Sequence, residues 1–562
     1  MFKPRHASAG TVAVLAAVFV FLAGCATLPQ AEKPFHLTIA HLNDHHAHLD
    51  GTSLSLKLGQ QSTYVTAGGL PRIAAKMKQV RAADDNVLLL HAGDVFTGTL
   101  YFNKYKGRAD ADLMNLIGFE AMTLGNHEFD QGPPVLASFL TSLRFPVLSA
   151  NTDVSREPVL NGLVRSSMVK EVQGQKIGLI GLTTPETEKI SRPGPNVHFQ
   201  AVAAAAEREV QALTNQGVNK IIAVTHLGLE DDIKLARAVP GLDVIVGGHS
   251  HTLLGDFASL GLAPEGPYPV VIDGPGGEKT MIVQSWKWAL VLGLIEVDFD
   301  LRGVVSGWQG RPLLLVGRDY RQKDQAGCLQ PVGPAQAALI SETLAGRRSI
   351  QVIDVDPAAE AKLAEYRAGI EAMQNEVMGR VKQDLIHRTG SGKASQVAPL
   401  VTRAMLDKLR ESRPELAFYL TNAGTMRTDL RQGPLTVAQI HELLPFDNTL
   451  VIMELTGAQI QAAIESGVKR GGGAWPCLAG ARFQAAPGKP GPQGLRIETL
   501  GPDSRWTILD EKKVYLVGTH SFVAGGGDGY EVLKTATGAR TDTGFIEADV
   551  FMEYVARRGT IP

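Results

Sequence analysis

The segment Gly-Asn-His-Glu-Phe-Asp at residues 125–130 contains the residue types that hold divalent cations and move protons in metal-dependent hydrolases. Similar clusters of histidine and aspartate occur on both sides of it in the first half of the chain. One match of this length carries a high risk of coincidence, whereas five in one chain are hard to explain by chance. The clusters are NDHHAH at 43–48, HAGDVF at 91–96, GNHEFD at 125–130, THLG at 225–228 and GGHSH at 247–251.

These clusters predict a centre for two divalent cations. Two neighbouring cations need a bridging carboxylate and further imidazole and oxygen ligands for each ion, and we predict Asp94 as the bridge. Asp44 and His46 are two residues apart, which puts both side chains on one face of an extended strand or within one turn. The donor set suits Zn, Mn, Co or Fe. The predicted ligands of one ion are Asp44, His46 and His251 with Asp94, and those of the other are Asn126, His226 and His249 with Asp94.

His127 follows a predicted ligand directly, but we expect it to have a different task. Asp130, three residues on, can accept one ring proton of His127 and so fix its tautomer and orientation. We therefore predict that His127 and Asp130 stabilise the transition state or assist the leaving oxygen. The reaction would be hydrolysis at phosphorus by water activated at the cations.

Each cluster follows an apolar run that is typical of a buried parallel strand. In open α/β sheets the carboxyl ends of such strands meet at one edge, where active sites form. Residues 70–83 have apolar side chains at helical spacing, and 201–217 are an alanine-rich stretch ended by glycine. The sequence therefore predicts an α/β fold with strands at 37–40, 87–90, 121–124, 221–224 and 244–246.

Four other histidines in this region have a simpler interpretation. A lone buried histidine is usually a hydrogen-bonded core residue. We expect His41, His45, His48 and His91 to be core residues or partners of the ligands.

The five clusters resemble the calcineurin-like metallophosphatases, and within them the 5'-nucleotidase family, in type and in order. The resemblance covers nearly all of the chain after its first residues. It implies a four-layer α/β/β/α metallophosphatase domain followed by a smaller α/β 5'-nucleotidase C-terminal domain, with the ligand set given above. Similar proteins have an amide or a histidine at the position of His251, so the metal preference can differ within the family.

The second half of the chain carries further matches to this family. Asn422 and Arg427 in TNAGTMR resemble its substrate motif, although Ala423 and Thr425 replace two glycines. Phe446 in LPFDNT and Phe522 in SFVAGGGDGY match two rings that sandwich a nucleobase, and Asp528 matches an acid that contacts the nucleoside. Stacking on aromatic rings is worth about 1 to 3 kcal/mol per base, and the planar fork of arginine suits phosphate. Core packing is the alternative for both phenylalanines.

One departure from the family pattern concerns phosphate binding. An arginine expected before the start of the next helix is missing, because the chain reads SGKASQVAPL at 391–400. Lys393 or Arg388 can replace it, but a lysine does not offer the bidentate geometry of arginine. The resemblance therefore implies a nucleotide without fixing which one.

The first residues predict export. Lys3 and Arg5 precede an apolar stretch from Thr11 to Ala23, as in a signal peptide at 1–24, and LAGC ending at Cys25 resembles a bacterial lipoprotein box. We expect a lipid anchor at Cys25 and a location on the periplasmic face or outer membrane of a bacterium; a plain signal peptide is the alternative. With 55 basic and 57 acidic residues, the chain has no overall basic field for nucleic acid polymers.

The pattern divides the rest of the chain into three parts: a metallophosphatase domain at 34–318, a connector at 319–379 and a substrate-binding domain at 380–562. The connector is expected to hold a helix from Pro357 to Met378, stopped by Gly379. In similar proteins this helix links the domains, and rotation of the second domain carries the nucleotide to the metals. Spacing leaves open whether Cys328 and Cys477 form a disulfide, and it does not define the oligomeric state.

The sequence favours hydrolysis of nucleoside 5'-monophosphates, with UDP-sugars or NAD-type pyrophosphates as further substrates. A 2',3'-cyclic phosphodiesterase with 3'-nucleotidase activity and a thiosulfohydrolase are alternatives on the same fold. An aromatic pair for a nucleobase has no purpose in a thiosulfohydrolase. A surface lipoprotein that binds nucleotides without catalysis is an alternative of another class, but it would be expected to have lost ligands, and every predicted position holds a competent residue.

Overall fold

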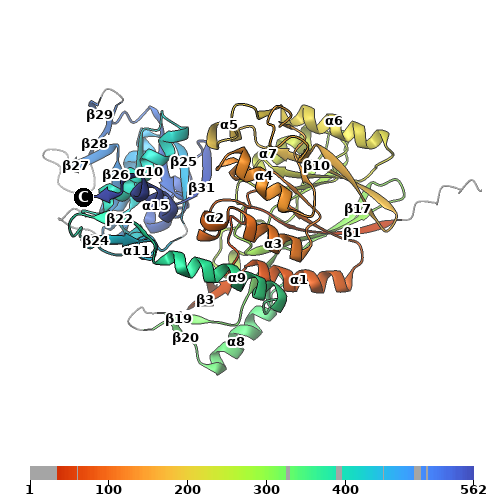
Figure 1. Cartoon of the computed structure of the whole chain (residues 1–562), viewed down its shortest axis with the longest axis horizontal. Helices are drawn as coiled ribbons and strands as arrows, with labels where there is room; N and C mark the ends of the chain where they lie inside the picture. Colours follow the sequence, from red (N-terminus) through yellow and green to blue (C-terminus); the bar gives the residue numbers. More distant parts are fainter. Residues whose placement is uncertain are drawn as a thin grey trace, which may run out of the picture.

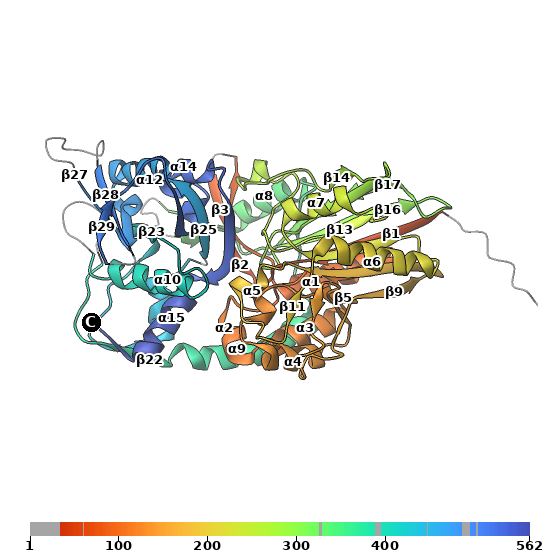
Figure 2. The ribbon, with the colours of Figure 1, turned by 90° about the horizontal axis from the view of Figure 1, so that it is seen from above.

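The computed structural model describes residues 34–562 except 60, 325–328, 388–394, 447, 486–494 and 502–503. Cys25, Cys328, Arg388 and Lys393 lie outside the described residues, and Cys477 is a free thiol. Two α/β domains lie side by side, with helix α9 (Pro357–Gln374) running along one side of both (Figures 1 and 2). None of the helices in the described part of the chain has the length and apolar character needed to cross a membrane.

Two sheets form the centre of the first domain. Within the described residues the larger sheet has 13 strands and the smaller has six. The larger runs in the order β20 (Leu329–Pro331), β19 (Arg321–Lys323), β3 (Gln61–Ala67), β18 (Leu313–Val316), β16 (Val291–Phe299), β1 (Phe35–Leu42), β4 (Val87–His91), β5 (Ala121–Thr123), β6 (Val147–Leu148) and β8 (Val164–Arg165), with β2 (Thr52–Leu58), β17 (Val305–Gly310) and β21 (Ile350–Val352) paired beside that path. The smaller runs β14 (Val270–Asp273), β15 (Lys279–Val283), β13 (Val244–Val246), β12 (Ile221–His226), β10 (Gln175–Thr183) and β9 (Ser167–Val172).

The alternation of side chains along these strands explains the layers. On β1, Leu37 and Ile39 pack with Ile222 and Val224 of β12, so the two sheets share one apolar core. Ala40 and Leu42, which point to the opposite face of β1, belong to a second core with α1 (Leu70–Ala83) and α3 (Arg108–Ile117). On the outer face of the smaller sheet lie α6 (Val202–Asn215) and α7 (Leu229–Ala238). The predicted α/β/β/α order is thus confirmed.

The second domain is built on a sheet of five strands, counted over the described residues. Its order is β26 (Pro476–Ala479), β23 (Phe418–Asn422), β30 (Val514–His520), β25 (Thr449–Thr456) and β31 (Arg540–Ile546). Helix α12 (Gly457–Arg470) packs on one face, while α10 (Ala398–Ser412) and α15 (Glu547–Arg558) lie together on the other side. The edge strand β31 faces the first domain (Figure 2).

The connecting helix ends earlier than its composition predicts. Asp356 caps α9, accepting a hydrogen bond from Ala359 N, and the helix stops at Gln374 instead of Met378. Met378 belongs to β22 (Val377–Val381), which pairs with β24 (Gly433–Thr436) of the second domain. Pairing with a distant strand overrides the local helix preference of these residues. Two other strands of the predicted connector join the sheet of the first domain: β19 pairs with β3, and β21 pairs with β18.

Candidate active site

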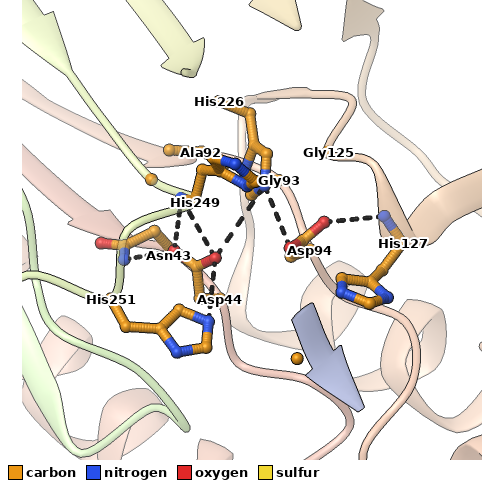
Figure 3. Close-up of polar contacts among 12 residues, drawn as sticks. Asn43, Asp44, Ala92, Gly93, Asp94, Gly125, His127, His226, His249 and His251 are labelled. Carbon is orange, nitrogen blue, oxygen red and sulfur yellow. Dashed lines mark hydrogen bonds and ion pairs between the residues drawn. The ribbon is translucent and has the colours of Figure 1, made fainter. Parts of the chain in front are cut away.

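Six of the predicted ligands form two adjacent groups at the carboxyl ends of strands. Ligand atoms of Asp44, His46 and His251 lie within 4.8 Å of one another, and those of Asp94, His226 and His249 form a second such group. The residues come from the loops after β1, β4 and β13 and from the last position of β12. In Figure 3, Asp44 and Asp94 lie among His226, His249 and His251.

A tight turn, not an extended strand, brings Asp44 and His46 together. The backbone at five of the six residues is left-handed, a region that residues other than glycine rarely adopt. Such a conformation costs about 1 to 3 kcal/mol per residue and clusters at functional sites. Backbone hydrogen bonds from Asp44 N to Gly93 O (3.0 Å) and from His46 N to Asp94 O (3.1 Å) hold the turn. The φ angles are 50° at Asp44, 49° at His46, 58° at Asp94, 77° at His249 and 51° at His251.

Hydrogen bonds at Nδ1 of His46 and His226 aim the Nε2 atoms of these two rings at the acids. His46 Nδ1 lies 2.9 Å from Phe96 O, and His226 Nδ1 lies 2.7 Å from Ala92 O. A carbonyl oxygen only accepts, so each Nδ1 carries the proton and, in the neutral ring, Nε2 carries a lone pair. This is the tautomer that a metal-binding histidine with an Nε2 contact needs. Burial lowers the pKa of His46 to about 3 and that of His249 to about 4, which keeps both rings neutral.

The geometry fits divalent cations. His46 Nε2 lies 3.1 Å from His251 Nε2, which is 3.4 Å from Asp44 Oδ1. His226 Nε2 is 3.0 Å from Asp94 Oδ2 without the alignment of a hydrogen bond. Lone pairs and carboxylate oxygens facing one another at these distances repel unless a proton or a cation lies between them. Burial lowers the pKa of His226 and of His251, but the negative charge of Asp94 raises the pKa of His226 to about 9, and that of Asp44 does the same for His251. A bound cation would therefore displace a proton from each ring.

Asp94 lies between the two groups, where a bridging ligand would be. Its Oδ2 is 3.8 Å from His46 Nε2 in one group and 3.0 Å from His226 Nε2 in the other. Oδ1 accepts a hydrogen bond from His127 N at 3.0 Å. The seventh predicted ligand, Asn126, is buried, and its Oδ1 has no hydrogen-bond partner among the residues that the structure describes. That orphaned oxygen is a further observation in favour of a cation.

His127 and Asp130 form the predicted pair. Nδ1 of His127 is 2.6 Å from Oδ2 of Asp130, and the carboxylate is itself held by Thr97 Oγ1 (2.7 Å) and Ser191 Oγ (2.8 Å). Burial disfavours the imidazolium, but Asp130 and Asp94 raise the pKa of His127 to about 10. In the metal-free protein the ring is therefore protonated at neutral pH.

Two buried groups support the metal-binding loops. Glu128, inside GNHEFD, accepts hydrogen bonds from four backbone amides, those of Asp94, Val95, Phe96 and Gly125, and so joins the loops after β4 and β5. The motif alone did not indicate this role of Glu128, although a charged residue inside a buried motif is a signal of such a role.

His45 and His91, which were expected to be core residues or partners of the ligands, form the second group. Gly93 N donates to His91 Nδ1 (3.2 Å), so His91 Nε2 donates to His45 Nδ1 (2.8 Å) and His45 Nε2 donates to Asp110 Oδ1 (3.0 Å). All three side chains in this chain of hydrogen bonds are buried. His45 thus anchors the turn between Asp44 and His46.

The predicted substrate residues all belong to the second domain. Asn422 Nδ2 donates to Asp528 Oδ2 (2.8 Å), and Asn422 Oδ1 accepts from His520 Nε2 (2.9 Å). The ring of His520 stacks in turn on Phe522. Arg427 lies over the ring of Phe446 at 5.7 Å.

The two phenylalanines are not core residues. Phe446 is 43% exposed and Phe522 is 46% exposed, which is unusual for large apolar side chains. This exposure is what rings that receive a ligand would show, and it argues against the core-packing alternative.

Comparison with known proteins supports both halves of this description. The calcineurin-like phosphoesterase family matches residues 37–253, and the 5'-nucleotidase C-terminal domain family matches residues 377–535. A probable 5'-nucleotidase of Treponema pallidum is 34% identical, covering 95% of this chain and 94% of that protein. The chain belongs to the 5'-nucleotidase family. Among solved structures, the NAD nucleotidase of Haemophilus influenzae is 32% identical with a TM-score of 0.83, covering 94% of this chain and 97% of that one. A 5'-nucleotidase precursor from Thermus thermophilus is 40% identical with a TM-score of 0.59, covering 94% and 97%.

In this member of the 5'-nucleotidase family, each domain carries part of the candidate site, and each part lies within one of the two family matches. The phosphoesterase match contains both groups of candidate ligands and the His127–Asp130 pair. The C-terminal match contains the five predicted substrate residues, but it ends before β31. Membership of the metallophosphatases implies divalent metals, in agreement with the two candidate clusters.

Proposed function

We propose that the chain hydrolyses nucleoside 5'-monophosphates to nucleosides and phosphate with two divalent cations. The observation that carries this proposal is the pair of ligand groups on either side of Asp94, next to the His127–Asp130 pair. Relatives named 5'-nucleotidase that match nearly the whole chain support the nucleotide as substrate.

In this proposal seven residues hold the cations. Bound there, the cations would neutralise phosphate oxygens and activate a water for attack on phosphorus. Asp94 would hold both at a fixed separation. Asp44, His46 and His251 would complete one site, and Asn126, His226 and His249 the other.

His127 would supply the proton for the leaving group. Asp130 holds Nδ1–H, so the second proton of the imidazolium resides on Nε2. When the water oxygen bonds to phosphorus, the bond from phosphorus to the ester oxygen breaks, and that oxygen can take the Nε2 proton. Asp130 stabilises the imidazolium before the transfer and keeps the ring oriented after it.

The nucleoside would bind to the second domain. Phe446 and Phe522 offer exposed rings to the base, Arg427 a guanidinium to phosphate, and Asn422 with Asp528 polar groups to the sugar. In the present arrangement Gly544 of β31 lies against His127: a Cβ added to Gly544 would be 2.5 Å from His127 Nε2. The leaving oxygen has to occupy that position, so the second domain has to move before the reaction. The resemblance to the family likewise implies a rotation of the second domain.

Pyrophosphates of the NAD type are a second candidate substrate class. The solved structure with the TM-score of 0.83 is named an NAD nucleotidase, and a Haemophilus influenzae relative named NAD 5'-nucleotidase is 32% identical over 94% of this chain. Cleavage of a pyrophosphate uses the same attack on phosphorus with a phosphate as leaving group.

The test is phosphate release by the purified protein with Mn²⁺ or Zn²⁺ from AMP, UMP, UDP-glucose, NAD and 2',3'-cyclic AMP. UDP-glucose, NAD and 2',3'-cyclic AMP are assayed with added alkaline phosphatase, because their cleavage yields monophosphates. We expect release from AMP or UMP that depends on the metal and falls strongly in His127→Ala. Release from none of the five, with both cations bound, would refute the proposal. Cleavage of the cyclic nucleotide alone would favour the cyclic phosphodiesterase.

We also propose a lipid anchor at Cys25, supported by the sequence LAGC at 22–25 behind an apolar stretch. Acyl chains on Cys25 would tether the enzyme to a bacterial membrane. Expressed in a bacterium, the protein is expected in the membrane fraction and Cys25→Ser in the soluble periplasmic fraction. Equal distribution of the two would contradict the anchor.

A further inference from the structure

Asp542, in the second domain, contacts a candidate metal ligand of the first. Its carboxylate lies 3.5 Å, Oδ2 to Nδ1, from His251, as an ion pair without the alignment of a hydrogen bond. The side chains are only 6% exposed for His251 and 18% for Asp542. This ion pair crosses the domain interface, where β31 lies beside the loops of the site (Figures 2 and 3).

The other ring nitrogen of His251 belongs to the candidate metal group. Nε2 is 3.4 Å from Asp44 Oδ1 and 3.1 Å from His46 Nε2. The imidazole therefore lies between the ligand atoms on one side and the Asp542 carboxylate on the other. A negative charge beside Nδ1 favours the tautomer with the proton on Nδ1, which leaves the Nε2 lone pair for a cation.

His251 differs from two other histidines of the site in this respect. Nδ1 of His46 and Nδ1 of His226 donate to backbone carbonyls of the first domain. Beside His251 Nδ1, the corresponding position is taken by the negatively charged carboxylate of Asp542, from the second domain. A carboxylate makes imidazole a stronger ligand than a neutral carbonyl does.

The local structure of β31 holds Asp542 in position. Thr449 Oγ1 donates to Asp542 Oδ2 (2.8 Å), and Gly544 N donates to Asp542 Oδ1 (3.1 Å). The register between β25 and β31 shifts directly after Asp542, and Gly544 in this bulge has a φ of 68°. Bulges of this kind redirect side chains near active sites. The absence of a Cβ at Gly544 lets the strand approach His127 and His46.

The same strand also leads to the nucleoside-binding part of the domain. Thr449 begins β25 three residues after Phe446, and Glu547, the first residue of α15 directly after β31, accepts hydrogen bonds from Thr425 and Asn448. The residues that contact His251 and the residues expected to contact nucleotide are therefore joined by strand pairing and hydrogen bonds within one domain.

We propose that Asp542 is a positioning residue for the cation held by Asp44, His46 and His251, acting through the Nδ1–H of His251. The inference rests on the proposed two-cation function. It makes the affinity of one cation depend on the contact between the domains. By thermodynamic linkage, that cation in turn favours the arrangement in which β31 contacts His251.

The test measures the affinities of the two cations, not only activity. Metal-free protein is titrated with Zn²⁺ or Mn²⁺ in competition with a chromogenic chelator, for the wild type, Asp542→Asn and Asp542→Ala. We expect one of the two affinities to fall about 10- to 100-fold, more in Asp542→Ala than in Asp542→Asn, because the amide can still accept from Nδ1–H. The other affinity stays as in the wild type, and excess cation restores phosphate release from AMP.

Two further variants complete the experiment. Asp384→Asn removes another carboxylate of the second domain, one that pairs with Arg431 on the surface, and should bind both cations as the wild type does. Thr449→Val removes only the hydroxyl that holds Asp542, and should weaken the same site several-fold even if the Asp542 variants fail to fold.

The outcomes separate the two proposals. If folded Asp542→Ala binds both cations with wild-type affinity, the role of Asp542 is overturned and the proposed function stays intact. If the Asp542 variants do not fold, wild-type affinities in Thr449→Val have the same meaning. A wild-type protein that binds neither cation would refute the metal centre itself.

Discussion

The Nε2 atoms of His46 and His251 lie 3.1 Å apart, although the residues come from loops after two different sheets. Two imidazole lone pairs at this distance would repel each other, so in the metal-free protein a proton of His251 lies between the two nitrogens. The fold thus holds together two nitrogens that a cation can join in place of this proton.

Cation binding should therefore stabilise the fold. For chelator-treated protein, Mn²⁺ or Zn²⁺ at 100 times its dissociation constant should raise the free energy of unfolding by about 2.7 kcal/mol for each site. The measurement is the thermal unfolding midpoint with and without the cation. Ca²⁺ is the control, because it prefers oxygen ligands to imidazole. A midpoint that does not respond to Mn²⁺ or Zn²⁺ would be evidence against the centre.

Replacing His127 should affect catalysis without affecting metal content. His127→Ala is expected to lower kcat for AMP by about 10²- to 10⁴-fold, the usual contribution of a positioned acid. Bound metal, measured by elemental analysis, should stay at the wild-type level, because His127 is in neither ligand group. His36→Ala is the matched control, since His36 forms a similar pair with Asp298 (2.7 Å) on the surface. Loss of metal together with activity would show that His127 is a ligand instead.

Glu547→Gln should impair nucleotide binding. The buried carboxylate accepts hydrogen bonds from Tyr419 (3.1 Å), Thr425 (2.8 Å) and Asn448 (3.1 Å), and so joins the segments that carry Arg427 and Phe446. A glutamine presents an NH₂ group to these donors and loses about 1 to 1.5 kcal/mol of interaction. We expect KM for AMP to rise about tenfold with metal content unchanged. The exposed Glu511→Gln is the control, and an unchanged KM in Glu547→Gln would contradict this role.

Asp232 should make stability depend on pH. Burial raises the pKa of this carboxyl to about 7, while Thr225 Oγ1 donates to it. Because the folded state then holds a proton that the unfolded state has lost, stability falls as pH rises from about 4 to about 7, by at most about 4 kcal/mol. Urea midpoints of metal-free protein at pH 5 and pH 8 should differ less in Asp232→Asn than in the wild type. The exposed Glu230→Gln should behave as the wild type, and equal pH dependence in all three proteins would refute the effect.

Periodicity and motif order predicted the parts of the fold that depend on local sequence. The spacing of Ile73, Met77 and Val80 predicted α1 with the observed bounds, and apolar runs such as 221–224 located the strands that end at the site. Such elements can be predicted from a short stretch of sequence, because the spacing of the apolar residues on one face distinguishes a helix from a strand.

Contacts between distant residues could not be predicted in the same way. The left-handed turn at Asp44 and His46 depends on backbone hydrogen bonds to the loop after β4. The end of α9 depends on a strand that pairs with β24. Nothing near Asp542 in the sequence indicates that it meets His251, because only the arrangement of the domains brings them together.

The most direct test of the account is to count bound cations and measure phosphate release from AMP on the same preparation. Chelator-treated protein should release no phosphate, and activity should return as Mn²⁺ or Zn²⁺ approaches two ions per chain. Asp94→Ala should not regain activity at any cation concentration, because Asp94 lies between both groups. Full activity without bound cations, or in Asp94→Ala, would contradict the two-cation mechanism.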